Sequence, residues 1–140
     1  MFQAGVHKVR AHRAFLAAFS DYFAALFGGG MNESVQNEVT LHEVDGNSFV
    51  HIIDFAYSGS ITISRDTVES LLETANYLGV EQVTRACCAY LADRLDVVNA
   101  LPVLKTADDL GLQSLVTKVK QLLLIKIHHQ VLHSVTAYIS

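Results

Sequence analysis

The stretch VRAHRAFLAAFSDYFAALF, residues 9–27, decides how this chain folds. It starts inside a short, roughly alternating segment, residues 5–11, which weakly predicts a β-strand. Over residues 14–27 the large apolar side chains recur at helical spacing, and only Ser20 and Asp21 interrupt an apolar surface. A helix that is apolar on nearly every side is normally buried. We therefore expect one helix here, deep inside the domain.

Periodicity and capping residues predict further elements on the C-terminal side of this stretch. Residues 38–44 alternate like a strand, and Asp45 is a suitable N-cap for a helix whose apolar residues recur every three or four positions. The remaining signals are Gly59 as the end of that helix, a β-type segment at 61–63, Ser64 as the cap of the next helix and Gly79 as its end.

The rest of the chain predicts helices only. Residues 80–91 carry another helical stripe. Pro102 breaks no hydrogen bond in a first turn, whereas inside a helix it would cost about 3 kcal/mol. We therefore start the next helix with Asn99 as its cap and end it at Gly111, before a last stripe that begins at Leu112. The fold class is α+β, purely helical after about residue 65.

Composition restricts the function classes. The chain has 140 residues, 51% of them hydrophobic, a mean hydropathy of +0.30 and a formal net charge of −4. An acidic balance argues against a general nucleic-acid binder. No apolar run reaches the ~18 residues that a membrane span needs, and the N-terminus has no secretory signal pattern. The two adjacent cysteines, Cys87 and Cys88, indicate a reducing compartment, the cytosol or the nucleus.

No pattern of residues predicts catalysis, a metal site or a cofactor. His129 and His133 lie four residues apart, but their segment offers no cysteine or carboxylate to complete a metal shell. The glycines at 28–30 lack the Lys-Ser/Thr of a phosphate loop, so they indicate a turn. Neither cysteine shows the neighbouring base that a nucleophile requires. We expect a protein that is not an enzyme.

Several motifs resemble those of the BTB/POZ domain of kelch-like proteins. Residues 9–18 are similar to the signature in which Ala-His-Arg precedes hydrophobic-Leu-Ala-Ala, and residues 20–27 continue it as S-x-Y-F-x-A-x-F. Residues 49–59 and 83–91 resemble two later motifs of the family, and residues 99–111 resemble the opening of the BACK domain, the 3-box region. Together these matches extend over roughly residues 6–120.

The resemblance implies a BTB/POZ fold, a helical cluster with a small β-sheet, at residues 1–95 and a partial, helical BACK domain at 96–140. Family members carry a dimerisation helix and a first strand before the signature, and we expect this chain to lack both. Arg13 would then lose the aspartate that such a strand provides. The resemblance assigns structural roles to His12, Arg13, Ser20, Tyr22, Phe23 and Cys87.

The resemblance also implies a binding site for the scaffold protein cullin-3. Met31-Asn32-Glu33 follows the glycine turn and looks like the hydrophobic-x-Glu motif by which BTB adaptors bind cullin-3. Tyr57 matches an aromatic residue that family members present beside that loop. A methionine offers an adaptable apolar contact, and a glutamate offers a directional charge.

The expected function is therefore that of a substrate adaptor of a cullin-3 RING ubiquitin ligase, whose protein substrate binds another domain. The alternative is the dimerisation and corepressor-recruiting BTB domain of a transcription regulator. The BACK-like residues 99–120 argue against that alternative. BTB domains of the full-length family form homo- or heterodimers, but we expect no regular homodimer from this chain. The identity of the substrate does not follow from the sequence.

Overall fold

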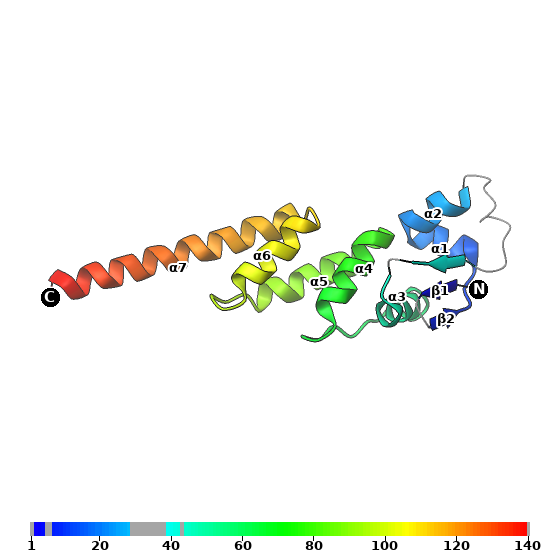
Figure 1. Cartoon of the computed structure of the whole chain (residues 1–140), viewed down its shortest axis with the longest axis horizontal. Coiled ribbons are helices and arrows are strands. Elements are labelled where there is room, and N and C mark those ends of the chain that lie inside the picture. Colours follow the sequence, from blue (N-terminus) through cyan, green and yellow to red (C-terminus); the bar gives the residue numbers. More distant parts are fainter. Residues whose placement is uncertain (1, 5–6, 29–38, 43, 140) are drawn as a thin grey trace. The chain divides into compact units, whose positions relative to one another are not determined.

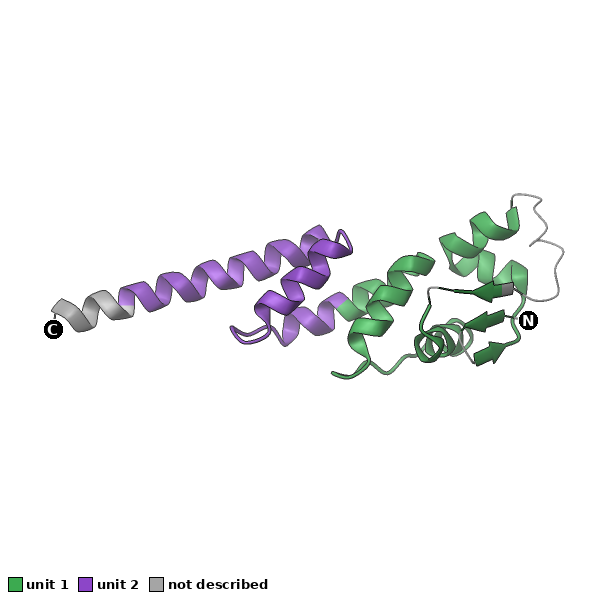
Figure 2. Ribbon diagram, viewed as in Figure 1, with its two compact units in different colours: residues 1–87 green, residues 88–140 purple. Residues whose placement is uncertain are grey.

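The structure is a computed structural model that describes residues 2–4, 7–28, 39–42 and 44–139, without the side chains of Val39 and residues 133–139. It divides into two compact units, residues 1–87 and residues 88–140, shown in different colours in Figure 2. The first unit contains the sheet and most of the helices, and the second is helical. Each unit is described by itself.

A small mixed sheet of three-residue strands forms part of the first unit (Figure 1). Strand β1 (Phe2–Ala4) lies between β2 (His7–Val9) and β3 (Val39–Leu41). It pairs antiparallel with β2 and parallel with β3. The strands predicted within residues 5–11 and 38–44 are confirmed. We had placed no strand before residue 5, and β1 shows that this was wrong.

Two helices, not one, follow the sheet's second strand. They are α1 (Arg13–Phe19) and α2 (Asp21–Gly28). Ser20 between them is extended, with φ −129° and ψ 127°, so the predicted single helix was wrong. Its hydroxyl accepts a hydrogen bond from the backbone N–H of Phe23 at 3.3 Å, which is how a serine caps a new helix. Only Leu16 and Phe23 are buried hydrophobic residues in this pair, so the predicted deep burial was also wrong.

Helices α3 (Gly46–Ser58) and α4 (Val68–Leu78) begin and end close to the predicted positions. The Asp45 carboxylate accepts from the backbone N–H of Ser48 at 2.9 Å, and Gly59 ends α3 with a φ of +79°. Residues 61–63 form no strand. The N-cap of α4 is Thr67 instead of Ser64, because Ser64 lies at the start of a turn in which its N–H donates to the Thr67 hydroxyl.

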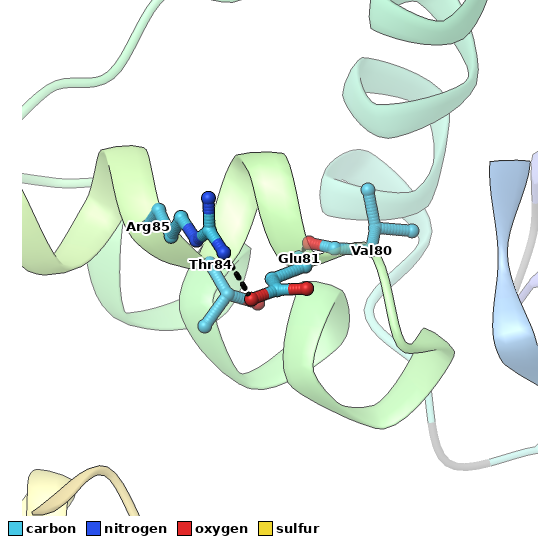
Figure 3. A network of polar contacts seen from close by, with 4 residues as sticks. All are labelled: Val80, Glu81, Thr84 and Arg85. Atoms are coloured by element: carbon cyan, nitrogen blue, oxygen red, sulfur yellow. Dashed lines mark hydrogen bonds and ion pairs between the residues drawn. The ribbon is translucent and has the colours of Figure 1, made fainter.

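Helix α5 (Glu81–Asp93) follows Gly79, whose φ of +67° ends α4. On its exposed side the Arg85 guanidinium pairs with the Glu81 carboxylate at 2.6 Å, and the Thr84 hydroxyl donates to the Val80 carbonyl (Figure 3). Solvent-exposed pairs of this kind contribute little to stability. The opposite side of α5 carries the buried residues Val83 and Cys87.

The core of the first unit combines one face of each element. Aromatic rings gather around Phe23, which lies 5.4 Å from Phe2 and 6.4 Å from Phe49 between ring centroids. The aliphatic part of this core comes mainly from α3 and α4: Ile52, Ile53, Val68, Leu71, Leu72 and Leu78. The buried positions of both helices recur at three- and four-residue spacing, which is the pattern that predicted them.

The second unit contains helices α6 (Ala100–Asp109) and α7 (Gln113–Ile139). Asn99 is the N-cap of α6 and Pro102 lies in its first turn, as predicted, while Gly111 turns the chain with a φ of +70°. The buried core between the two helices consists of Ala100, Val103, Ala107, Leu115, Val116 and Val119. Within the described residues, no helix is both long and apolar enough to cross a membrane.

Candidate functional site

An exposed pair of aromatic rings marks the candidate site on the first unit. Tyr57, in the last turn of α3, stacks on Phe15 of α1 with ring centroids 4.6 Å apart and planes inclined by 18°. Half of Tyr57 and 38% of Phe15 remain accessible to solvent. Aromatic rings with free faces are the side chains most often found at the energetic centre of a protein interface.

Hydrogen bonds to His12 hold the Tyr57 hydroxyl at the start of α1. The backbone N–H of His12 donates to the Tyr57 oxygen at 3.0 Å, and the His12 Nδ1 lies 3.2 Å from the same oxygen. The residues are 45 positions apart in the sequence. Because its ring is stacked and its hydroxyl is anchored, Tyr57 presents a preorganised surface and loses little rotational freedom on binding.

A second aromatic contact continues the same packing between α1 and α3. Phe19 lies one helical turn after Phe15 and packs against Phe55, with ring centroids 5.9 Å apart. Phe55 is half-buried, so this contact adds apolar packing between the two helices that carry the exposed pair. The other two predicted binding residues, Met31 and Glu33, lie outside the described residues. Of that predicted triplet, the structure therefore places Tyr57 alone.

Most residues of the predicted structural signature lie in or against the core of the first unit. The buried Ser20 hydroxyl donates to the Leu78 carbonyl at the end of α4. Phe23 and Cys87 are almost completely buried, and Tyr22 packs against both Phe23 and Tyr77. His12 differs from these residues because it is exposed and hydrogen-bonded to Tyr57.

Arg13 retains contacts that we did not predict. Its guanidinium carbon lies 5.8 Å from the centroid of the Phe27 ring, within the range of a cation–π interaction. The side chain is half-buried. The expectation that Arg13 would be left as a buried charge without a partner was therefore wrong. Arg13 lies in α1 and Phe27 lies in α2, so this contact joins the two helices that the break at Ser20 separates.

The described part of the chain was also compared with what a metal site or a reactive thiol requires. Among the residues whose side chains are described, no three histidines, cysteines or carboxylates gather as a metal site would require. Burial raises the pKa of the Cys88 thiol, and Lys118 opposes part of that rise. A raised pKa lowers the thiolate fraction and with it the nucleophilicity of the sulfur.

The second unit has a groove of its own between α6 and α7. Leu101, Leu104 and Val116 supply its apolar lining, and Lys105, Asp108 and Lys120 its charged lining. Leu101 is largely exposed, although it lies in the first turn of α6 next to Pro102. Such a groove can accept an apolar side chain of a partner and place charged groups beside it.

Comparison with known proteins assigns the family. Residues 1–95 match the BTB/POZ domain. The chain therefore belongs to the BTB/POZ family, whose domains are protein-interaction modules. The structure also resembles the BTB domain of zebrafish PATZ1, with a TM-score of 0.58 and 28% identity over 66% of this chain and 73% of that one. The predicted α+β fold, helices with a small sheet, is confirmed.

The curated relatives are kelch-type proteins. The chain is 37% identical to human kelch-like protein 28 over 115 residues, which is 82% of this chain and 20% of that protein. It is 40% identical to zebrafish (Danio rerio) kelch-like protein 21 over 81% of this chain and 18% of that protein. It is 43% identical to human kelch repeat and BTB domain-containing protein 6 over 71% of this chain and 15% of that protein. It thus spans at most a fifth of these relatives.

The likeness to kelch-like protein 28 extends past the BTB match. The alignment covers 115 residues of this chain, and the BTB match accounts for at most 95 of them, so at least 20 lie beyond residue 95. The chain beyond residue 95 belongs to the second unit and begins in the turn between α5 and α6. The relationship therefore extends into the helical part of the chain that lies beyond the BTB match.

Phe15 is the residue of this site that sequence reasoning missed. It lies inside the signature, where its apolar neighbours suggested burial. The signal that could have found it is spacing: His12, Phe15 and Phe19 recur at three and four residues and so share one face of α1. Leu16, on another face, is the residue that enters the core.

Proposed function

We propose that this chain is the cullin-binding part of a substrate adaptor for a cullin-3 RING ubiquitin ligase. The observation that carries the proposal is the exposed Tyr57 ring, stacked on Phe15 and anchored to His12, on a BTB domain related to kelch-like proteins. Met31 and Glu33 complete the proposed contact by resemblance to the family's hydrophobic-x-Glu motif. The protein substrate is expected to bind a different domain.

The groove between α6 and α7 supports the same proposal from the second unit. We infer that residues 96–140 are the start of a BACK domain, whose first helices share in cullin binding in this family. Lys120 at the groove would attract a carboxylate, whereas Lys105 is paired with Asp109 at 3.0 Å, and Leu101 offers an exposed apolar contact. This part is expected to act in the cytoplasm or the nucleus, where cullin ligases meet their substrates.

A second proposed partner is another BTB domain. Ala14 and Ala18 of α1 and Ala24 and Ala25 of α2 are all exposed. Exposed small apolar side chains allow the close approach of another helix. We place any contact with a second BTB domain on this surface, and we do not expect a regular, tight homodimer from it.

Calorimetry with the N-terminal part of cullin-3 tests the adaptor proposal. Removing an aromatic anchor at the centre of an interface commonly costs about 1 to 4 kcal/mol. Tyr57→Ala is therefore expected to weaken binding by about fivefold or more, since 1.4 kcal/mol is a factor of ten. The double change Met31→Ala/Glu33→Ala should produce a loss of similar size.

The matched control is Tyr77→Ala. Tyr77 is also exposed, at 44%, and also packs against an aromatic ring, that of Tyr22 at 5.2 Å. It belongs to α4 and not to the proposed surface. It should leave the affinity within about twofold of the wild type. Equal affinities for wild type, Tyr57→Ala and the double variant would refute the site, and no binding by the wild type would refute the function.

A further inference from the structure

One imidazole nitrogen lies within hydrogen-bond distance of the Tyr57 hydroxyl. The Tyr57 oxygen is 3.0 Å from the backbone nitrogen of His12 and 3.2 Å from the Nδ1 of the same residue. A backbone N–H can only donate, so the Tyr57 oxygen accepts that bond. The second contact has no fixed sense, because a ring nitrogen accepts when it is unprotonated and donates when it carries a proton.

With a neutral His12 the two contacts complement each other. When Nε2 carries the ring proton, the bare Nδ1 accepts the Tyr57 O–H while the backbone N–H donates to the Tyr57 oxygen. Hydrogen bonds that are linked in this way polarise and strengthen each other. The hydroxyl proton then has its partner within the domain, so the stacked rings of Tyr57 and Phe15 can be covered without burying an unpaired donor from this group.

A protonated His12 breaks this arrangement. Both nitrogens of an imidazolium carry a proton, so Nδ1 and the backbone N–H of His12 would both donate to one oxygen. The Tyr57 O–H must then turn away from His12 and toward solvent. An apolar partner that covers the ring would bury an unpaired hydroxyl beside a positive charge, and both burials cost free energy.

Neighbouring groups supply no ion pair for a charge on His12. Arg10 and Arg13 are the nearest cations along the chain, and they add to a positive charge instead of neutralising it. On α3 the exposed titratable residues before the tyrosine are His51 and Asp54. Among the side chains that the structure describes, no carboxylate forms an ion pair with His12. Histidine changes its charge between about pH 5 and 8, so this change falls in the physiological range.

We propose that His12 is a positioning residue, which makes binding at the Tyr57 ring depend on pH. The inference rests on the proposed cullin-3 contact of Tyr57 and adds the chemistry of the group that fits there. That group is an apolar side chain placed on the stacked rings, and it binds when His12 is neutral. The backbone bond holds Tyr57 in both states, whereas the His12 side chain sets the direction of the O–H.

Calorimetry with the N-terminal part of cullin-3, from about pH 5.5 to about pH 8, tests the proposal. The wild type should bind about fivefold or more tightly at the upper end, which corresponds to one unpaired buried hydroxyl. His12→Asn places an amide oxygen near the position of Nδ1, cannot titrate and is a favoured N-cap, so it should lose most of this dependence. His51→Asn removes an exposed histidine of α3 outside the site and should keep the wild-type profile.

Differences between these profiles isolate His12 from the groups of the cullin, because those groups titrate in the same way with every variant. A flat wild-type profile would overturn the proposal. So would tighter binding at low pH, which would place an anion of the partner beside His12, or an unchanged dependence in His12→Asn. Circular dichroism at both ends of the pH range confirms that each protein is folded.

Nitrogen NMR of the imidazole rings, on the full chain without cullin, separates this inference from the proposed function. At about pH 8 His12 should carry its proton on Nε2, and in Tyr57→Phe its Nδ1 signal should move toward that of a nitrogen without a hydrogen bond. A proton on Nδ1 at this pH would overturn the proposal. The expected NMR result with no cullin binding at any pH would support the role of His12 and refute the cullin contact instead.

Discussion

Replacing Ser20 by alanine should destabilise the first unit more than its small size suggests. The Ser20 hydroxyl donates to the Leu78 carbonyl in the last turn of α4 and accepts from the Phe23 N–H in the first turn of α2. Both backbone groups lie at helix ends, where the helix itself supplies no partner. One buried hydroxyl therefore satisfies the ends of two helices, although Leu78 lies 58 residues beyond Ser20 along the chain.

The magnitude follows from those two bonds. Each contributes about 0.5 to 1.5 kcal/mol net, and a buried carbonyl left without a partner costs about 1 to 3 kcal/mol. We expect Ser20→Ala to lower the free energy of unfolding by about 2 to 3 kcal/mol. In a unit of this size that corresponds to a fall of about 10 °C or more in melting temperature.

Urea denaturation followed by circular dichroism measures this loss, with Ser58→Ala as the control. The Ser58 hydroxyl also makes a hydrogen bond, to the Ser60 carbonyl at 3.2 Å, but it is exposed. The control should cost less than about 0.5 kcal/mol. If Ser20→Ala were as stable as Ser58→Ala, the role of this hydroxyl in joining α2 to α4 would be refuted.

Three further predictions concern backbone, thiol and cap. Gly79→Ala should lower the free energy of unfolding more than Gly59→Ala does. Both glycines have positive φ, but only a Cβ at residue 79 meets Asp21, at 2.8 Å. Urea midpoints of the two variants check this order, and equal losses would contradict it. Cys88 should be alkylated at a higher pH than a cysteine in a short peptide, because burial raises its pKa, and Lys118→Gln should shift the profile further upward. By linkage, the raised pKa stabilises the fold below the ordinary thiol pKa, and that stabilisation is lost as pH rises through the raised one. Asn99→Ala should cost about 1 kcal/mol by urea denaturation, because its side chain accepts from Asp96 N–H at 2.8 Å and donates to the Arg94 carbonyl at 2.7 Å; an unchanged midpoint would contradict this.

Local signals in the sequence predicted helices α3, α4 and α6 well, but not the division between α1 and α2. Asp45, Gly59, Gly79 and Asn99 each act on the backbone within a few residues, so their effects depend little on the rest of the fold. The predictions that failed depended on distant partners. Nothing near residues 61–63 shows that they lack a neighbouring strand, and the partner of Ser20 is Leu78. Hydrophobic content alone could not show that α1 and α2 expose most of their alanines.

The candidate site shows the same division between local and distant information. Tyr57 was predicted by resemblance, whereas its stacking on Phe15 and its bond to His12 join segments that are more than 40 residues apart. The stronger geometric restraint on the Tyr57 hydroxyl is a backbone N–H, which every residue except proline provides at position 12. The histidine side chain adds a second contact at 3.2 Å. The position of the Tyr57 ring therefore depends more on where the backbone of α1 begins than on the identity of the side chain at position 12. One short stretch, residues 12–23, therefore supplies both the backbone N–H that anchors the Tyr57 ring and the buried Ser20 and Phe23, which pack into the core of the first unit.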